Sequence, residues 1–209
     1  MGRVKISKEQ LSKLDTVAFT GTIHVIDSAE LVKDAIAHLS WQERVGFDTE
    51  TRPSFKRGVV YSIALMQIST LTDCFLFRLN TIGVPAELKE FLENEAITKI
   101  GLSLRDDFGR LHAVSDTVPR GFVELQAIAP QYGIADASLQ KIYAIIFNQR
   151  ISKNQRLTNW EADQLTPGQQ SYAAIDAWAC LKIYNHLESV GFDPLASQYY
   201  TEDDETPTI

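Results

Sequence analysis

Three short segments, far apart along the chain, place acidic side chains where the surrounding pattern turns residues inward. The residues concerned are Asp48, Glu50, Asp107 and Asp176, together with the phenol of Tyr172. A buried carboxylate is costly unless something neutralises its charge. Metal cations are the obvious candidate for that neutralising partner. Oxygen ligands that hold two cations form a site that cleaves phosphodiesters.

The first segment, residues 44–49, has the pattern of a β-strand. Side chains alternate between the two faces of a strand, so Gly46, Asp48 and Glu50 point the same way. Gly46 leaves room for another backbone or a ligand to approach the carboxylates. The alternative is a strand whose polar face is simply wet, as in many antiparallel sheets.

The second segment is a helix that opens near Ser103 and buries an apolar stripe starting at Leu104. Each residue advances about 100° around the axis, which puts Asp107 about 60° from Leu104, beside the stripe. Asp106 falls on the opposite side and is predicted to be solvated. The alternative is that Asp107 pairs with a neighbouring arginine at the helix edge.

The third segment, Thr-Pro-Gly-Gln at residues 166–169, has the signature of a helix start. Threonine serves as the N-cap, proline takes the first position and glutamine closes a capping box. From this start, Tyr172 and Asp176 lie four residues apart and share one helix face. The alternative is a tyrosine hydroxyl that only satisfies a buried aspartate.

No histidine or cysteine belongs to this set of residues. An all-oxygen site selects hard cations, so we expect Mg²⁺ or Mn²⁺ rather than zinc or copper. Cys74 and Cys180 lack the spacing of a zinc site or a redox pair. We predict that both are free, buried thiols.

Length and charge narrow the class of protein. A chain of 209 residues fits one domain, and a net charge of −7 argues against coating nucleic acid through a broad basic surface. The same charge is compatible with an enzyme that grips a few nucleotides. No apolar run is long enough to span a bilayer, and the first residues lack a signal-peptide core. We expect no membrane partner and a cytoplasmic protein, or a nuclear one in a eukaryote.

Strand-like segments dominate the first half of the chain and helical segments the second. Strands are expected at 44–49, 61–69, 74–79 and 97–100, with a turn at 71–73, and helices at 29–39, 85–94, from 103, at 121–132, 138–147 and 166–190. This order predicts a mixed sheet flanked by helices, an α/β domain. We assign one domain to residues 1–195, with its motifs between about 24 and 187, and a disordered acidic tail to 196–209.

Taken in order, the motifs resemble the DEDDy branch of the 3′–5′ exonuclease superfamily. They are Phe47-Asp48-Thr49-Glu50, then Lys99-Ile100-Gly101 followed by Asp107, then Tyr172-x-x-x-Asp176. The DEDDh branch has a histidine where this chain has Ser171. Stretches at 122–125, 159–160 and 169–184 resemble the Werner-syndrome-type exonuclease domain, and the resemblance covers about residues 24–187. It implies a ribonuclease-H-like fold with three α/β/α layers.

The resemblance also implies roles for the residues. Asp48, Glu50, Asp107 and Asp176 would hold two divalent cations, Mg²⁺ or Mn²⁺, about 4 Å apart. Tyr172 would orient the attacking water. The reaction would release 5′-mononucleotides from a free 3′ end of DNA, with RNA as a further substrate. The alternatives are an RNA-processing exonuclease of the ribonuclease D type and a catalytically silent nucleic-acid-binding module.

Two basic loops flank the acidic motifs. Predicted phosphate contacts come from Thr51, Arg52, Arg57, Lys153 and Arg156, with Lys56 and Arg150 beside them. Such residues guide a nucleic-acid backbone, although ordinary solvated loops are the alternative. Trp160 is expected to pack in the core rather than stack on a base. Phe55 is interpreted either as a wedge against the terminal base or as a loop anchor.

Overall fold

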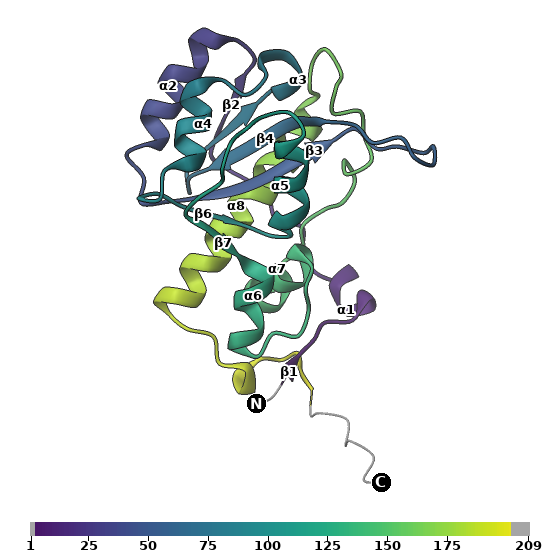
Figure 1. Ribbon diagram of the computed structural model, residues 1–209. Coiled ribbons are helices and arrows are strands. Elements are labelled where there is room, and N and C mark those ends of the chain that lie inside the picture. The colour runs from purple at the N-terminus through teal and green to yellow at the C-terminus, as the bar shows by residue number, and fades with distance from the viewer. Residues whose placement is uncertain (1–2, 202–209) are drawn as a thin grey trace.

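A six-stranded mixed sheet forms the centre of the molecule (Figure 1). The structure is a computed structural model that describes residues 3–201. Across the sheet the strands lie in the order β2 (Thr22–Ile26), β5 (Asp73–Phe77), β4 (Ile63–Ser69), β3 (Arg44–Thr51), β6 (Thr98–Gly101) and β7 (Phe122–Glu124). β4 is antiparallel to both neighbours, and the other adjacent pairs are parallel.

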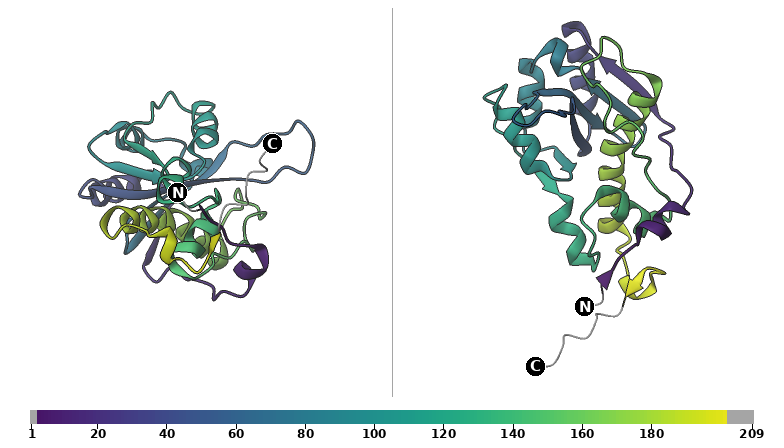
Figure 2. Two further views of the ribbon diagram at one scale, coloured as in Figure 1. Left: turned by 90° about the horizontal axis from the view of Figure 1, so that it is seen from below. Right: turned by 90° about the vertical axis from the view of Figure 1, so that its right-hand side faces the viewer.

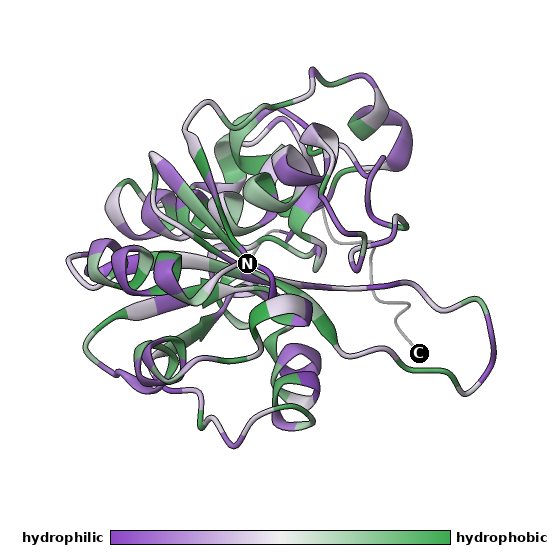
Figure 3. Ribbon diagram, turned by 90° about the horizontal axis from the view of Figure 1, so that it is seen from above, coloured by the Kyte–Doolittle hydropathy of each residue, from purple (hydrophilic) through white to green (hydrophobic). Residues whose placement is uncertain are grey.

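Helices cover both faces of this sheet, which confirms the predicted α/β class. The helices α2 (Ala29–Leu39), α4 (Ala86–Glu93) and α5 (Leu104–His112) pack on one face. The long α8 (Pro167–Ser189) crosses the other face, and α7 (Leu139–Phe147) packs against it (Figures 1 and 2). Figure 3 shows hydrophobic residues gathered on the strands between these layers. The shorter elements are β1 (Arg3–Val4), α1 (Lys8–Ser12), α3 (Leu79–Ile82), α6 (Leu125–Ile128), β8 (Tyr200–Thr201) and 3₁₀ turns at Ala129–Tyr132 and Pro194–Ala196.

Successive side chains of β3 point to opposite faces of the sheet. Val45 and Phe47 are buried on the α2 and α4 side, while Gly46 faces α8. A Cβ at Gly46 would lie 1.8 Å from the carbonyl oxygen of Ala177, so α8 crosses β3 in direct backbone contact. The next two residues on that face, Asp48 and Glu50, therefore emerge beside α8.

Two expectations from the sequence were wrong. Residues 121–132 were predicted as one helix, but they begin with β7, because this segment pairs in parallel with β6. Residues 196–201 were assigned to a disordered tail, but Tyr200 and Thr201 pair with β1 and Tyr199 is buried. The remainder of that predicted tail, 202–209, lies outside the described residues. Within residues 3–201, none of the helices combines the length and apolar character needed to cross a bilayer.

Candidate active site

Three carboxylates from two elements converge beside α8 at the later part of β3. Asp48 and Glu50 project from β3 and Asp176 from α8, and one oxygen of each lies within 4.8 Å of the others. Asp176 is buried, with 8% of its surface exposed, whereas Asp48 and Glu50 are partly exposed. The three side chains offer only oxygen atoms, so their arrangement suits a hard cation.

Asp107, on α5, lies outside this group of three but lines a cavity beside it. β6 pairs only with residues 44–46 of β3, which leaves the later part of β3 open toward α5. There the hydroxyl of Thr49 donates a hydrogen bond to the Asp107 carboxylate. A cavity of about 210 Å³ is lined by Asp107 together with Asp48 and Glu50. The structure thus brings all four predicted carboxylates to one region.

Glu124 holds α5 in place, and with it Asp107. Its carboxylate accepts hydrogen bonds from the backbone N–H groups of Ser103 at 3.1 Å and Leu104 at 2.8 Å. Ser103 is the N-cap residue, which agrees with a helix that opens near it, but it has a left-handed φ of 67° and its side chain makes no capping hydrogen bond. The reason is that a carboxylate from the adjacent β7 occupies the helix start, where N–H groups lack partners.

The start of α8 agrees with the prediction. Thr166 and Gln169 form both hydrogen bonds of the capping box. The buried amide of Gln169 also donates to the carbonyl of Asn159 at 3.1 Å. From the end of β5, the guanidinium of Arg78 donates to the carbonyls of residues 162–163. These contacts tie the segment before α8 to the sheet.

Tyr172 lies one turn before Asp176 on α8, and its hydroxyl partly offsets the raised pKa of that carboxylate. The ring lies 6.0 Å from Trp160, which is fully buried and is therefore the packing residue that was expected. Burial, reinforced by the carboxylates, raises the pKa of Tyr172 above its ordinary value of 10. The phenol is therefore neutral at pH 7.

Burial is the first cause of a raised pKa at all four carboxylates. The pKa is about 9 for Glu50, about 7 for Asp176 and about 6 for Asp107. The pKa of Asp48 lies well above its ordinary range, because the repulsion of Asp176, Glu50 and Asp107 adds to its burial. Nearby cations would favour the charged forms and lower these pKa values.

The predicted phosphate-contacting residues divide into two groups. Lys153 and Arg156 act on the carboxylates, since the charge of Lys153 partly offsets the raised pKa of Asp176 and Arg156 does the same at Glu50. Thr51 lines the carboxylate cavity, and its hydroxyl accepts a hydrogen bond from Arg110 at 3.3 Å. Of this first group, Thr51 lines the carboxylate cavity, and the two basic residues lie near enough for their charges to affect the carboxylates.

The second group lies farther out. Arg52 pairs with Glu161 at 3.4 Å and stacks on a tyrosine ring, so it bridges two loops. Arg57 is exposed in the β3–β4 loop, which projects from the body (Figures 2 and 3). Among the described residues, nothing ties Arg57 to the carboxylates. Arg150 has a structural role instead, because its Nε donates to the carbonyl of Leu14 at 2.9 Å.

A groove, here called the two-loop groove, lies between the β3–β4 loop and the segment before α8. It has a volume of about 530 Å³, and its lining residues are Arg52, Pro53, Ser54, Phe55, Lys56, Val59, Tyr61, Leu157 and Asn159. Phe55 is 83% exposed and Leu157 63% exposed. Phe55 therefore does not anchor the loop in the core, and its role as a wedge against the terminal base stays a prediction.

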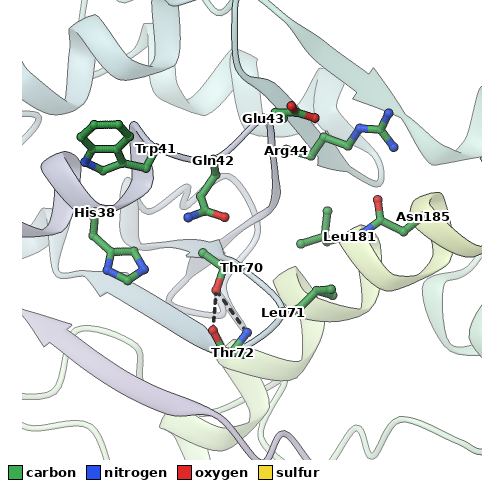
Figure 4. A pocket seen from close by; sticks show the side chains of 10 residues that line it. All are labelled: His38, Trp41, Gln42, Glu43, Arg44, Thr70, Leu71, Thr72, Leu181 and Asn185. Carbon is green, nitrogen blue, oxygen red and sulfur yellow. Dashed lines mark hydrogen bonds between the residues drawn. The ribbon is translucent and has the colours of Figure 1, made fainter.

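A separate cavity of about 620 Å³ lies at the other end of β3 (Figure 4). Its lining comes from the end of α2, the start of β3, the β4–β5 turn and α8, and it includes Trp41, which is 88% exposed. Glu43 is the one acidic residue among those lining it. A single carboxylate is a poor ligand set for a metal, so the candidate site remains at the Asp48 end of β3.

Known proteins match over the same part of the chain. A model of the 3′-5′ exonuclease family matches residues 23–191. This chain belongs to that family. The mouse bifunctional 3′-5′ exonuclease/ATP-dependent helicase WRN is 33% identical over an alignment of 171 residues that covers 79% of this chain. The exonuclease chain spans only 12% of the mouse protein's length.

Solved structures share the fold. The EXO domain of Aedes aegypti Nibbler superimposes with a TM-score of 0.71 at 19% identity, covering 83% of this chain and 92% of that one. Escherichia coli RNase D, described as an exoribonuclease involved in structured RNA processing, gives 0.71 at 22% identity, covering 83% of this chain and 47% of that one. These neighbours confirm the ribonuclease-H-like fold.

Sequence reasoning missed three residues that shape the site: Thr49, Arg110 and Glu124. Thr49 lies between two acidic residues, and strand alternation puts its hydroxyl on the opposite face of β3. That placement could have indicated a hydrogen bond to a group on that face, which is Asp107. Arg110 was treated only as a neighbour of the helix acids, although it also reaches Thr51. The only sequence signal for Glu124 was the 122–125 stretch. Its contact with α5 depends on the pairing of β7 with β6, which the local sequence does not reveal.

Proposed function

We propose that this chain is a metal-dependent 3′–5′ exonuclease that hydrolyses phosphodiester bonds at the free 3′ end of DNA and releases 5′-mononucleotides. The observation that carries the proposal is the meeting of Asp48, Glu50 and Asp176 oxygens within 4.8 Å. Asp107 joins them on the adjoining cavity, so the ligands suit two Mg²⁺ or Mn²⁺ ions. When bound, such ions supply an activated water and stabilise the leaving 3′ oxygen.

The protein's own groups would position the reactants. The four carboxylates would hold the ions from β3, α5 and α8, three elements fixed by packing and capping. Tyr172 hydrogen-bonds the attacking water and sets its direction toward phosphorus. The phenol is protonated in the metal-free site, so the role that we assign to it is to orient the water.

The two-loop groove supplies a path for the strand. It begins at Arg52, two residues after Glu50, so a strand with its 3′ end at the carboxylates enters this groove next. Phe55 and Leu157 offer exposed apolar surface for an unpaired base, and base–aromatic stacking contributes about 1–3 kcal/mol per base. Lys153 and Arg156 contact phosphates beside the site, and Arg57 contacts the strand farther out.

Digestion of end-labelled oligonucleotides tests the proposal. A 5′-labelled single strand is expected to shorten stepwise in Mg²⁺ or Mn²⁺ and to stay intact in EDTA, with 5′-mononucleotides as the product. Asp48→Ala is expected to abolish cleavage, whereas Asp34→Asn, an exposed carboxylate on α2, serves as the matched control.

Matched DNA and RNA strands separate the alternatives. Faster RNA digestion would support an RNA-processing exonuclease of the ribonuclease D type. Binding without mononucleotide release would indicate a silent nucleic-acid-binding module. Cleavage that persists in Asp48→Ala would overturn the assignment of the site.

A further inference from the structure

Gln67, in the middle of β4, has a fully buried side chain, and neither end of its amide has a hydrogen-bond partner. The backbone of β4 is already paired with a strand on each side, so its N–H and C=O groups do not need the amide of this side chain. A buried amide without a partner is unfavourable, and cores contain few of them. Gln67 therefore calls for a partner outside the ordinary core.

The register of the sheet shows where that partner lies. Gln67 stands directly opposite Asp48 in the antiparallel β3–β4 pair. Directly opposite residues share a face of the sheet, with Cβ atoms about 4.5–5.5 Å apart. The amide of Gln67 thus lies on the same face as the carboxylate cluster and is long enough to reach the nearer carboxylate.

Its register partner on the other neighbouring strand is apolar. Leu76, opposite Gln67 on β5, belongs to a hydrophobic cluster with Ala173 and Ala174 of α8. Trp160 in that cluster has an indole N–H that also lacks a partner, but an N–H can satisfy only the carbonyl end of an amide. The NH₂ end of Gln67 needs an acceptor, and Asp48 is the acceptor that the register supplies.

We propose that Gln67 is a positioning residue, whose NH₂ group donates a hydrogen bond to the Asp48 carboxylate when that carboxylate holds a divalent cation. The hydrogen bond fixes the orientation of the carboxylate, so that one oxygen faces the cation and the other faces the amide. Ligating carboxylates are commonly held by such outer partners, and loss of the partner costs about 10–100-fold in metal affinity or activity. The inference rests on the proposed function, because it assumes the metal site.

Gln67→Met tests the proposal, because methionine keeps the length of the side chain and removes the amide. The Mn²⁺ concentration that half-saturates the site, measured by calorimetry, is expected to rise about 10–100-fold. kcat should fall while KM for a single-stranded oligonucleotide stays unchanged. The Tm in EDTA should stay level or rise, since an unpartnered amide has been removed. Trp160→Phe, which removes the other unpartnered group, should bind Mn²⁺ like the wild type.

Wild-type Mn²⁺ affinity in Gln67→Met would overturn the proposal. Failure of the wild-type protein itself to bind Mn²⁺ and to cleave would instead overturn the proposed function, so the two failures are distinguishable. If Gln67→Met does not fold, the side-chain NH₂ resonances of Gln67 in the NMR spectrum of the wild-type protein test the proposal. They should shift and gain protection from solvent exchange as Mg²⁺ is added, and unchanged resonances would overturn the proposal.

Discussion

Replacing Gly46 by alanine tests whether the contact between β3 and α8 sets the spacing of the carboxylates. The added Cβ would lie 1.8 Å from the carbonyl oxygen of Ala177 and 2.7 Å from its carbonyl carbon. Both are backbone atoms, so α8 must retreat by more than about 1 Å. Overpacking costs about 1–3 kcal/mol. In a chain of this size, that lowers the Tm by roughly 2–12 °C.

The same retreat moves Asp176, which precedes Ala177 on α8. A misplacement of about 1 Å can cost about 100-fold in rate, so kcat of Gly46→Ala is expected to fall by about that factor. Thermal melts in EDTA and single-turnover cleavage of a labelled strand measure the two effects separately.

Gly109→Ala is the matched control. Gly109 is exposed on α5, and a Cβ there would meet nothing within 4 Å. Alanine in a helix interior is more stable than glycine by about 0.5–1 kcal/mol, so the Tm should rise and cleavage should stay unchanged. Wild-type Tm and kcat in Gly46→Ala would refute the reasoning about the helix contact, and a lowered Tm with full activity would refute its link to the carboxylates.

Three further predictions concern the site. Glu50, Asp176 and Asp107 have pKa values of about 9, 7 and 6, above the values near 4 of an unfolded chain, so the stability that these three groups contribute to the metal-free protein should be lost as pH rises from about 4 toward 9. Urea unfolding at pH 5, 7 and 9 in EDTA measures this change in the free energy of unfolding, and Mg²⁺ should make the change smaller. A free energy of unfolding that does not vary with pH in EDTA would contradict the prediction. Phe55→Ala should raise KM for a single strand by roughly 5–150-fold, from about 1–3 kcal/mol of stacking, with the Tm unchanged, and an unaltered KM would remove Phe55 from the strand path. Glu124→Gln should lower the free energy of unfolding by about 1 kcal/mol, because it weakens the cap of α5. It should also weaken Mn²⁺ binding, measured by calorimetry, because α5 carries Asp107. An unchanged Mn²⁺ affinity would show that the cap does not influence the metal site.

Local patterns were sufficient for most of the candidate site. Asp48 and Glu50 could be assigned because strand side chains alternate with a fixed period of two. The capping box at residues 166–169 fixed the helical phase, which put Tyr172 and Asp176 on one face. The apolar stripe of α5 distinguished Asp107 from its neighbour in the same way.

Features that depend on strand neighbours could not be predicted. β2 was not predicted, because threonine and histidine interrupt its apolar residues and pairing with β5 completes the strand. Glu124 caps a helix that begins about twenty residues earlier, which requires β7 to lie beside β6. The register that sets Gln67 opposite Asp48 is likewise a property of the assembled sheet.

The pairing of β1 with β8 makes the described part of the chain, residues 3–201, suitable for circular permutation. Arg3 and Thr201, 198 positions apart, are register partners, and neighbouring strands lie about 5 Å apart. A short linker can therefore join them without crossing the body. Opening the chain at Gly58, in the exposed β3–β4 loop with open space around it, would then yield new ends on either side of the strand path. In such a permutant the segments bearing Asp48 and Asp107 exchange their order along the chain, yet the sheet that joins them stays whole.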